Sequence, residues 1–171
     1  MNKGKKIILA TTLIVIIIAI LIVFLSPSGH EKRFKDILDE YDDIHTERLK
    51  NHEDESVLRC YDLEDSIGFI VISKGYEDEI VIFLELSLEK IDDVCILYQN
   101  ESEDHGDLVT EEWFLKRLNL PYNKELKIVR NKKENSNEVI AITGATITSD
   151  AVVEAINECA KTMEEIISEE N

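Results

Sequence analysis

The run Thr143-Gly144-Ala145-Thr146-Ile147-Thr148-Ser149 places four hydroxyl side chains around a single glycine. It lies where two secondary-structure patterns meet. The apolar residues 139–142 before it predict a strand. After Asp150, apolar residues recur at the spacing of one helical face, which predicts a C-terminal helix: Val152, Ala155, Ile156, Cys159, Met163, Ile166 and Ile167.

A strand, a small-residue turn and a helix start therefore meet at this run, and together they favour a bound phosphate. We expect Ser149 or Asp150 to cap the helix, whose first N–H groups have no partner within the helix. Such a helix start attracts anions. Gly144 and Ala145 allow the backbone to approach a ligand closely, and a threonine hydroxyl beside them can donate a hydrogen bond, act as a nucleophile or carry a covalent group.

The same run resembles the flavin-attachment motif of the FMN-binding domain family. That family includes the G subunit of Rnf electron-transport complexes and the C subunit of sodium-pumping NADH:quinone oxidoreductases. The resemblance implies that FMN is joined through its phosphate to Thr146, as a phosphoester made by a separate flavin transferase from FAD with magnesium. The motif residues implied to cradle the phosphate are Thr143, Gly144, Ala145, Thr148 and Ser149.

One position departs from the family motif. The family usually has an aspartate three residues before the position of Thr143, and this chain has Ile140 there.

A second resemblance lies in the loop at residues 99–107. In the family, the corresponding hairpin ends in Glu-Thr followed by a glycine-rich loop near the flavin. Glu101, Ser102 and Gly106 fall at matching positions, and His105 stands beside the glycine. Glu101, Ser102 and His105 are therefore further candidates for contact with the cofactor. Gly68-Phe69 and Gly75-Tyr76 also resemble the family pattern, so that the likeness covers about residues 57–167.

The N-terminus predicts a membrane anchor. Residues 1–6 contain three lysines, and residues 7–25 are apolar apart from two threonines. Nineteen helical residues rise roughly 28 Å, close to the hydrocarbon thickness of a bilayer. The lysines favour a cytoplasmic N-terminus, which places the rest of the chain outside the cytoplasm. A cleaved signal peptide is the alternative, but the run is longer than a usual signal core and has no clean cleavage site.

The remaining patterns predict one α+β domain with a mainly antiparallel sheet and flanking helices. Residues 26–55 comprise a linker and an amphipathic helix over 31–50, and residues 56–171 form the FMN-binding domain. Strands are expected at 56–61, 67–73, 80–88 and 91–98, the last two as a hairpin around Glu89-Lys90. A short helix is expected at 111–120, where Trp113 is either a core residue or a neighbour of the flavin ring.

Composition restricts the partners. The chain has 36 acidic and 19 basic residues, and three of the basic ones precede the apolar run. Such an acidic domain repels nucleic acid and anionic lipid, and it disfavours a loosely held FMN. Solubility, including in a salty medium, is the simpler explanation of the acidity.

The three cysteines and four histidines have no metal-binding spacing. Cys60, Cys95 and Cys159 are expected to be buried thiols, with a Cys60–Cys95 disulfide as the alternative.

The family resemblance thus implies an electron-carrying subunit of a membrane-bound, Rnf-type ion-translocating complex, with other membrane subunits as partners, rather than an autonomous enzyme. Two alternatives stay open. One is a membrane-tethered assembly or binding subunit of the same fold that lacks the flavin, which Ile140 favours. The other is a free-standing surface flavin carrier.

Overall fold

The computed structural model describes residues 29–122 and 124–169, so the anchor expected at residues 7–25 lies outside the described part. Among the described residues, no helix combines the length and the apolar composition of a membrane span. The short helix α2 (Gly29–Arg33) precedes a compact unit that begins at Phe34.

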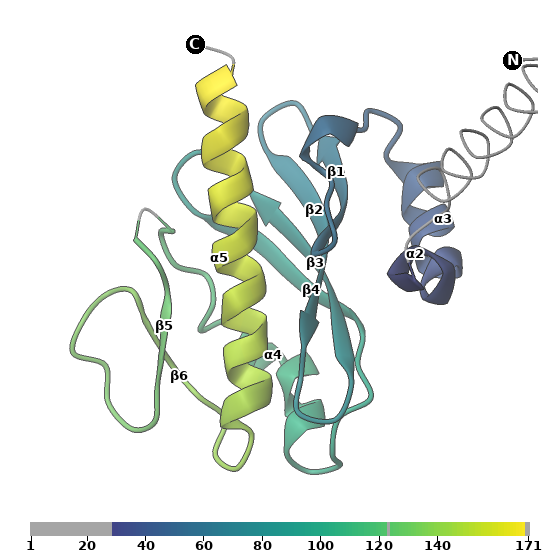
Figure 1. Cartoon of the computed structure of the whole chain (residues 1–171). Helices are drawn as coiled ribbons and strands as arrows, with labels where there is room; N and C mark the ends of the chain where they lie inside the picture. The colour runs from purple at the N-terminus through teal and green to yellow at the C-terminus, as the bar shows by residue number, and fades with distance from the viewer. Residues whose placement is uncertain (1–28, 123, 170–171) are drawn as a thin grey trace, which may run out of the picture. The chain divides into compact units, whose positions relative to one another are not determined.

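A four-stranded antiparallel sheet forms the centre of this unit (Figure 1). Its strands follow one another in the order of the sequence: β1 (Val57–Asp62), β2 (Ile67–Lys74), β3 (Glu79–Leu86) and β4 (Ile91–Tyr98). β2 and β3 are apolar almost without interruption, as expected for strands that are covered on both faces. The four predicted strands and the hairpin are confirmed.

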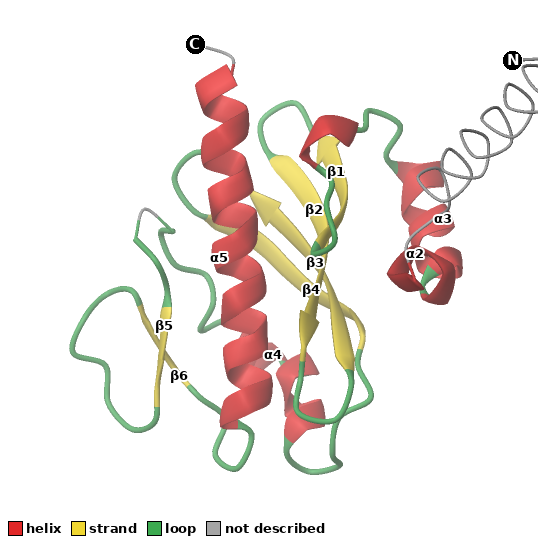
Figure 2. Ribbon diagram, in the orientation of Figure 1, coloured by secondary structure: helices red, strands yellow, loops and turns green. Residues whose placement is uncertain are grey.

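The two faces of the sheet bury separate apolar clusters. One contains Phe69, Ile82 and Leu84 and is covered by the 24-residue helix α5 (Thr146–Glu169), whose apolar side supplies Val152, Ile156 and Cys159 (Figure 2). The helical face predicted from the spacing is therefore confirmed. The opposite cluster packs Ile70, Val81 and Phe83 against Phe34 and Leu38.

The helix expected at residues 31–50 is shorter than predicted, because α3 spans only Lys35–Ile44. The next residues run extended along the outer edge of β1. Leu49 N–H donates to Cys60 O and Asp62 N–H to Glu47 O, both at about the usual length, and Arg48 forms an isolated bridge with Tyr61. The backbone of residues 47–49 thus provides hydrogen-bond partners for the open edge of β1, which a continued helix could not do.

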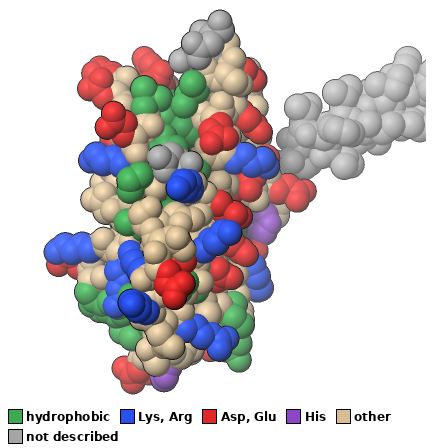
Figure 3. Space-filling view, turned by 90° about the vertical axis from the view of Figure 1, so that its left-hand side faces the viewer, with side chains coloured by type: hydrophobic (Ala, Val, Ile, Leu, Met, Phe, Trp, Pro, Cys, Tyr) green, Lys and Arg blue, Asp and Glu red, His purple; other side chains and the backbone are tan. Residues whose placement is uncertain are grey.

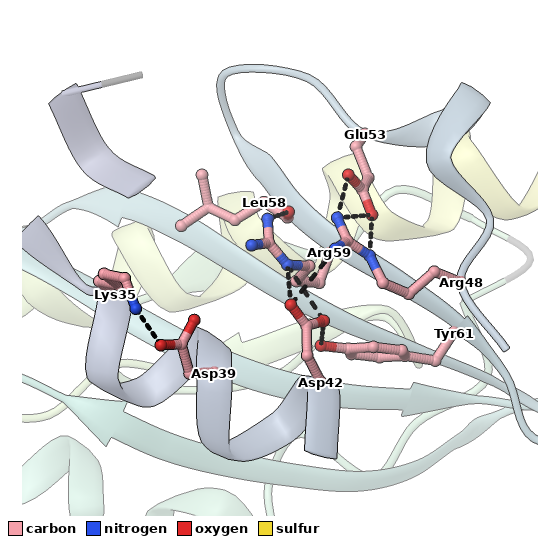
Figure 4. A network of polar contacts seen from close by, with 8 residues as sticks. All are labelled: Lys35, Asp39, Asp42, Arg48, Glu53, Leu58, Arg59 and Tyr61. Atoms are coloured by element: carbon pink, nitrogen blue, oxygen red, sulfur yellow. Dashed lines mark hydrogen bonds and ion pairs between the residues drawn. The ribbon is translucent and has the colours of Figure 1, made fainter. Parts of the chain in front are cut away.

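A partly buried ionic network fastens α3 to β1 (Figure 4). The Asp42 carboxylate accepts hydrogen bonds from Arg59 Nε at 3.1 Å, Arg48 Nη1 at 3.2 Å and the Tyr61 hydroxyl at 2.8 Å. Arg48 also pairs with Glu53 at 2.7 Å. Burial, together with the bond to Asp42, raises the pKa of Tyr61 well above its ordinary value. Two cations thus compensate the Asp42 charge.

A small parallel pair of strands leads into the candidate site. β5 (Lys127–Val129) pairs with β6 (Glu138–Ile140), so the strand predicted at 139–142 ends two residues earlier than expected. The Asn157 side chain holds the segment before β5 to α5 through two hydrogen bonds with the backbone of Leu126, at 2.8 and 3.0 Å. The face of the molecule seen in Figure 3 mixes basic and acidic side chains.

The expected helix at 111–120 is reduced to one turn, α4 (Glu112–Leu115). The short 3₁₀ helix η2 (Gly106–Thr110) precedes it. After α4 the chain continues in tight turns, with Arg117 N–H bonded to Phe114 O and Leu118 N–H to Leu115 O.

Candidate functional site

The run 143–149 forms the turn between β6 and α5. Gly144 has a φ of +86°, a left-handed conformation that costs glycine nothing and strains other residues. Ala145 N–H donates to Ile142 O at 3.0 Å and closes the turn. The first helical hydrogen bond then runs from Ser149 N–H to Ala145 O at 2.9 Å. The glycine therefore makes the sharp turn into α5 possible.

Helix α5 begins at Thr146, four residues before the expected start, so neither Ser149 nor Asp150 is its cap. The Ser149 hydroxyl is fully buried and donates to Ala145 O at 2.8 Å while accepting from Ile142 N–H at 3.0 Å. With these two partners, the Ser149 hydroxyl stabilises the turn itself. Its expected contact with a phosphate stays a prediction.

Thr146 is the first residue of α5 and is partly exposed, while Thr143 and Gly144 are exposed. Within the described part of the chain, neither threonine hydroxyl has a hydrogen-bond partner. The N–H groups of residues 146–148 precede the first intrahelical hydrogen bond. They form the positive end of the helix dipole, beside the hydroxyl of Thr146. The local geometry thus fits a phosphate group, although Ala145 is buried and its N–H is already used.

Glu101 lies directly at this helix start. Its Oε2 accepts a hydrogen bond from the Thr148 hydroxyl at 2.6 Å and from Tyr76 N–H at 3.0 Å. Its Oε1 accepts from Glu77 N–H at 3.0 Å and Asp78 N–H at 3.1 Å. We refer to Glu101, Thr148 and the N–H groups of residues 76–78 as the Glu101 clasp. Thr148 was expected to hold the phosphate, but its hydroxyl donates to Glu101 in this clasp.

The clasp favours the ionised carboxylate. Burial alone would raise the pKa of Glu101, but the hydrogen bonds from Thr148 and from the N–H groups of Asp78, Glu77 and Tyr76 outweigh it and lower the pKa below 4.5. No lysine or arginine of the described residues pairs with this carboxylate, so its charge is held by neutral donors alone.

Of the two other predicted loop residues, His105 lies against the motif, and Ser102 belongs to the same loop. A Cβ atom added to Gly144 would lie 2.5 Å from His105 Cδ2, so the imidazole rests on the glycine of the turn. His105 Nδ1 lies 3.2 Å from Glu103 O. Ser102 contributes through its carbonyl, which accepts from Asp107 N–H at 3.2 Å and shapes the loop. The structure therefore brings the two predicted segments, 99–107 and 143–149, together.

The β2–β3 turn is also part of this site; Gly75-Tyr76 resembles the family pattern, but a contact of this turn with Glu101 was not predicted. Residues 76–78 donate three N–H groups to Glu101. The available signal was Gly75, where a Cβ would lie 2.3 Å from Glu101 Oε1. Only a residue without a side chain fits beside the carboxylate.

Trp113 is not a core residue. Its side chain is 43% exposed, and the Arg117 guanidinium lies 4.6 Å from the ring centroid. Arg117 in turn donates to Ile140 O at 2.8 Å, which fixes the end of β6 just before the motif.

The cysteines are free and do not form the alternative disulfide. Cys60 and Cys95 lie on the two outer strands of the sheet and on opposite faces, too far apart for a bridge. Cys60 and Cys159 are buried as expected, but Cys95 is exposed. Burial raises the pKa of Cys60 to about 12. No group of three or more potential metal ligands occurs among the residues that the structure describes.

Comparison with known proteins identifies the family. The model of the FMN-binding domain matches residues 75–161, which contain the Glu101 clasp and the whole turn before α5. The chain belongs to the FMN-binding domain family. The match begins at the β2–β3 turn, so the FMN-binding domain model covers less of this chain than the expected 57–167.

Individual proteins are also similar to parts of this chain. The G subunit of the Na(+)-translocating ferredoxin:NAD(+) oxidoreductase complex of Acetobacterium woodii is 33% identical over 87 residues. That alignment covers 50% of this chain and 42% of the relative, so the chain spans less than half of that protein's length.

Two solved structures are also similar. NqrC of Shewanella oneidensis has 22% identity and a TM-score of 0.47, over 54% of this chain and 47% of that chain. The C subunit of the Na(+)-translocating NADH-quinone reductase of Parabacteroides distasonis has 14% identity and a TM-score of 0.46, over 61% and 60% of the two chains.

Proposed function

We propose that this chain is an electron-carrying subunit of a membrane-bound, Rnf-type ion-translocating oxidoreductase complex, and that FMN is attached through its phosphate to Thr146. The observation that carries the proposal is the position of Thr146. Its hydroxyl is partly exposed, stands at the first residue of a 24-residue helix and follows a glycine turn within the matched family segment. When bound, FMN would supply a ring that takes up and releases electrons.

The residues around Thr146 would orient and neutralise the phosphate. The N–H groups at the start of α5 offer donors to its oxygens, and the positive end of the helix dipole lowers the cost of its charge. Thr143 adds an exposed hydroxyl on the other side of Gly144. His105 rests on Gly144, and the other proposed ring neighbours, Glu101 and Ser102, belong to the same loop.

A covalent link explains how an acidic protein could retain an anionic cofactor on an exposed turn. In the proposed attachment, a flavin transferase supplies FAD and magnesium. The Thr146 oxygen forms a bond to the phosphorus of the FMN half, the pyrophosphate bond breaks and AMP leaves. The hydroxyl proton passes to solvent, and no electrons are exchanged in this step. A tether through phosphate leaves the flavin ring itself unsubstituted.

The apolar residues 7–25 would anchor the chain in the cell membrane, with the N-terminus in the cytoplasm and the FMN-binding domain outside. Other membrane subunits of an Rnf-type complex would then be the electron donor and acceptor. The similarity over half of the chain to the G subunit from Acetobacterium woodii supports this assignment.

A second candidate is a membrane-tethered assembly subunit that keeps the fold without the flavin. Ile140 favours it, because this position lacks the acid typical of the attachment motif.

In-gel flavin fluorescence distinguishes the two. The full chain is coexpressed with a flavin transferase and separated on a denaturing gel, beside Thr146→Val and the neighbouring variant Thr143→Val. Thr162→Val, on α5 outside the run 143–149, is the control. We expect fluorescence in the wild type and in Thr162→Val and its complete loss in Thr146→Val, while Thr143→Val shows whether the neighbouring motif hydroxyl is needed for attachment. A wild-type band without fluorescence would support the flavin-free subunit, and Ile140→Asp then tests whether the missing acid is the cause.

A further inference from the structure

The Glu101 clasp joins three segments that are distant in the sequence. Glu101 and Thr148 are separated by 47 positions, and Glu101 and Tyr76 by 25. The carboxylate links the β2–β3 turn, the loop after β4 and the start of α5. Each of its two oxygens accepts two hydrogen bonds.

Two glycines show that the surrounding backbone is built closely around this carboxylate. A Cβ at Gly75 would lie 2.3 Å from Glu101 Oε1, and a Cβ at Gly106 would lie 2.6 Å from Glu101 Cβ and 3.2 Å from Thr148 Oγ1. Real side chains cannot occupy these positions without moving the neighbouring atoms. The close fit therefore depends on the absence of side chains at both sites.

The clasp acts on the attachment residue indirectly. Thr148 is the third residue of α5, two positions after Thr146, and its hydroxyl is buried against Glu101. The two residues differ by about 200° around the helix axis, so fixing Thr148 toward the protein turns Thr146 toward the outside. With both oxygens occupied by donors of the chain, Glu101 has little capacity left for a ligand.

We propose that Glu101 is a positioning residue, which holds the first turn of α5 through Thr148 so that the Thr146 hydroxyl is presented to the flavin transferase. This inference rests on the proposed function. The first turn of a helix lacks internal hydrogen bonds on its N–H side and frays easily. A hydroxyl that must be held in one orientation reacts more slowly when the helix turn that carries it becomes mobile.

The test measures initial rates of covalent flavin incorporation into the purified full chain, with transferase, FAD and Mg²⁺, over a range of substrate-protein concentrations. Thr148→Val removes the link to α5 but leaves the three backbone bonds of Glu101. Thr162→Val is the matched control, because Thr162 is also buried in α5 and its hydroxyl bonds to Glu158 O of the same helix at 3.2 Å. Thr148→Ser restores a hydroxyl.

We expect Thr148→Val to lower kcat for incorporation about tenfold with little change in KM, since a hydrogen bond to a charged group is lost. Thr162→Val and Thr148→Ser should stay within about threefold of the wild type. If the loss of a buried threonine hydroxyl only weakened the fold, both valine variants would contain less folded chain able to react. Equal kcat values in Thr148→Val and Thr162→Val overturn the positioning role.

Amide hydrogen exchange checks the clasp itself. In Glu101→Gln, one oxygen becomes an NH₂ group that cannot accept the N–H bonds, so exchange at residues 76–78 should accelerate about tenfold while β3 stays protected. Unchanged exchange there also overturns the proposal. A wild-type chain that accepts no flavin refutes the proposed function, whereas incorporation that is indifferent to Thr148 refutes the positioning role alone.

Discussion

Two carboxylates each join segments that are far apart in the sequence: Asp42 belongs to α3 and bonds to β1, and Glu101 follows β4 and bonds to the start of α5. Asp42 accepts from two arginines and a tyrosine, and it fastens a helix to a sheet. Glu101 accepts only from a hydroxyl and three backbone N–H groups, and two glycines make room for it. The ionic network of Asp42 serves packing, while the neutral donors around Glu101 fix backbone beside an exposed hydroxyl.

This difference matters for recognising a site. A charged cluster stands out in a structure, but Asp42, Arg48 and Arg59 are bonded to one another and to neighbouring groups of the fold. The Glu101 clasp is less conspicuous, yet it lies against a left-handed glycine, a helix start and Thr146. Accessible donors beside a rigid turn are therefore a better indication of function here than the number of ion pairs.

The largest effect on stability is expected for Asp42→Ala. The variant removes the carboxylate that accepts from Arg59, which is only 7% exposed, and the same change removes the acceptor of the buried Tyr61 hydroxyl. We expect the free energy of unfolding to fall by about 3 kcal/mol. Urea denaturation measures this loss, and flavin incorporation at a temperature where the variant is folded should match the wild type. Slower incorporation by the folded variant would mean that the two regions are coupled.

Gly144→Ala should have a smaller effect on stability and a direct one on the site. The added methyl group strains a residue at a φ of +86° and displaces the His105 ring. We expect a loss of about 1 to 2 kcal/mol in the same denaturation assay, together with slower flavin incorporation. Gly29→Ala is the control, since nothing lies within 4 Å of its Cβ position. A Gly144→Ala chain as stable as this control would argue against the turn described for residues 143–149.

The pH dependence of the clasp should give the smallest effect. The folded-state pKa of Glu101 lies below its ordinary value of 4.5, so the clasp contributes stability above pH 4.5 that is lost as the pH falls through the folded-state pKa. The stability difference between the wild type and Glu101→Gln should therefore shrink on acidification below pH 4.5. Thermal unfolding of both chains across this range measures it. A difference that grows in acid would show that the pKa is raised instead.

Much of the fold could be predicted from the sequence because its periodicity is strong. The strands β1 to β4 and the apolar side of α5 follow directly from the spacing of Phe69, Leu84, Val152 and similar residues. Helix boundaries are harder to predict. Ser149 looks like a cap, but its hydroxyl bonds back to Ala145 and Ile142, and α3 ends early because the next residues complete the edge of β1.

The candidate site could be predicted in part. The motif around Thr146 and the loop around Glu101 can be found as short local patterns, and they do meet in the structure. The contribution of residues 76–78 depends on main-chain N–H groups, which every residue except proline carries and which no sequence pattern marks. Trp113 was expected either in the core or beside the flavin ring. Its helix has only a single turn, and the indole ring lies at the surface beside Arg117.

The central claim is that Thr146 carries FMN as a phosphoester. Peptide mapping by mass spectrometry of the chain isolated from its native source tests it most directly. We predict that the peptide containing residues 143–149 carries the added mass of FMN less one water, with fragment ions placing it on Thr146. Recovery of that peptide only in its unmodified form, or with FMN on another residue, would contradict the claim.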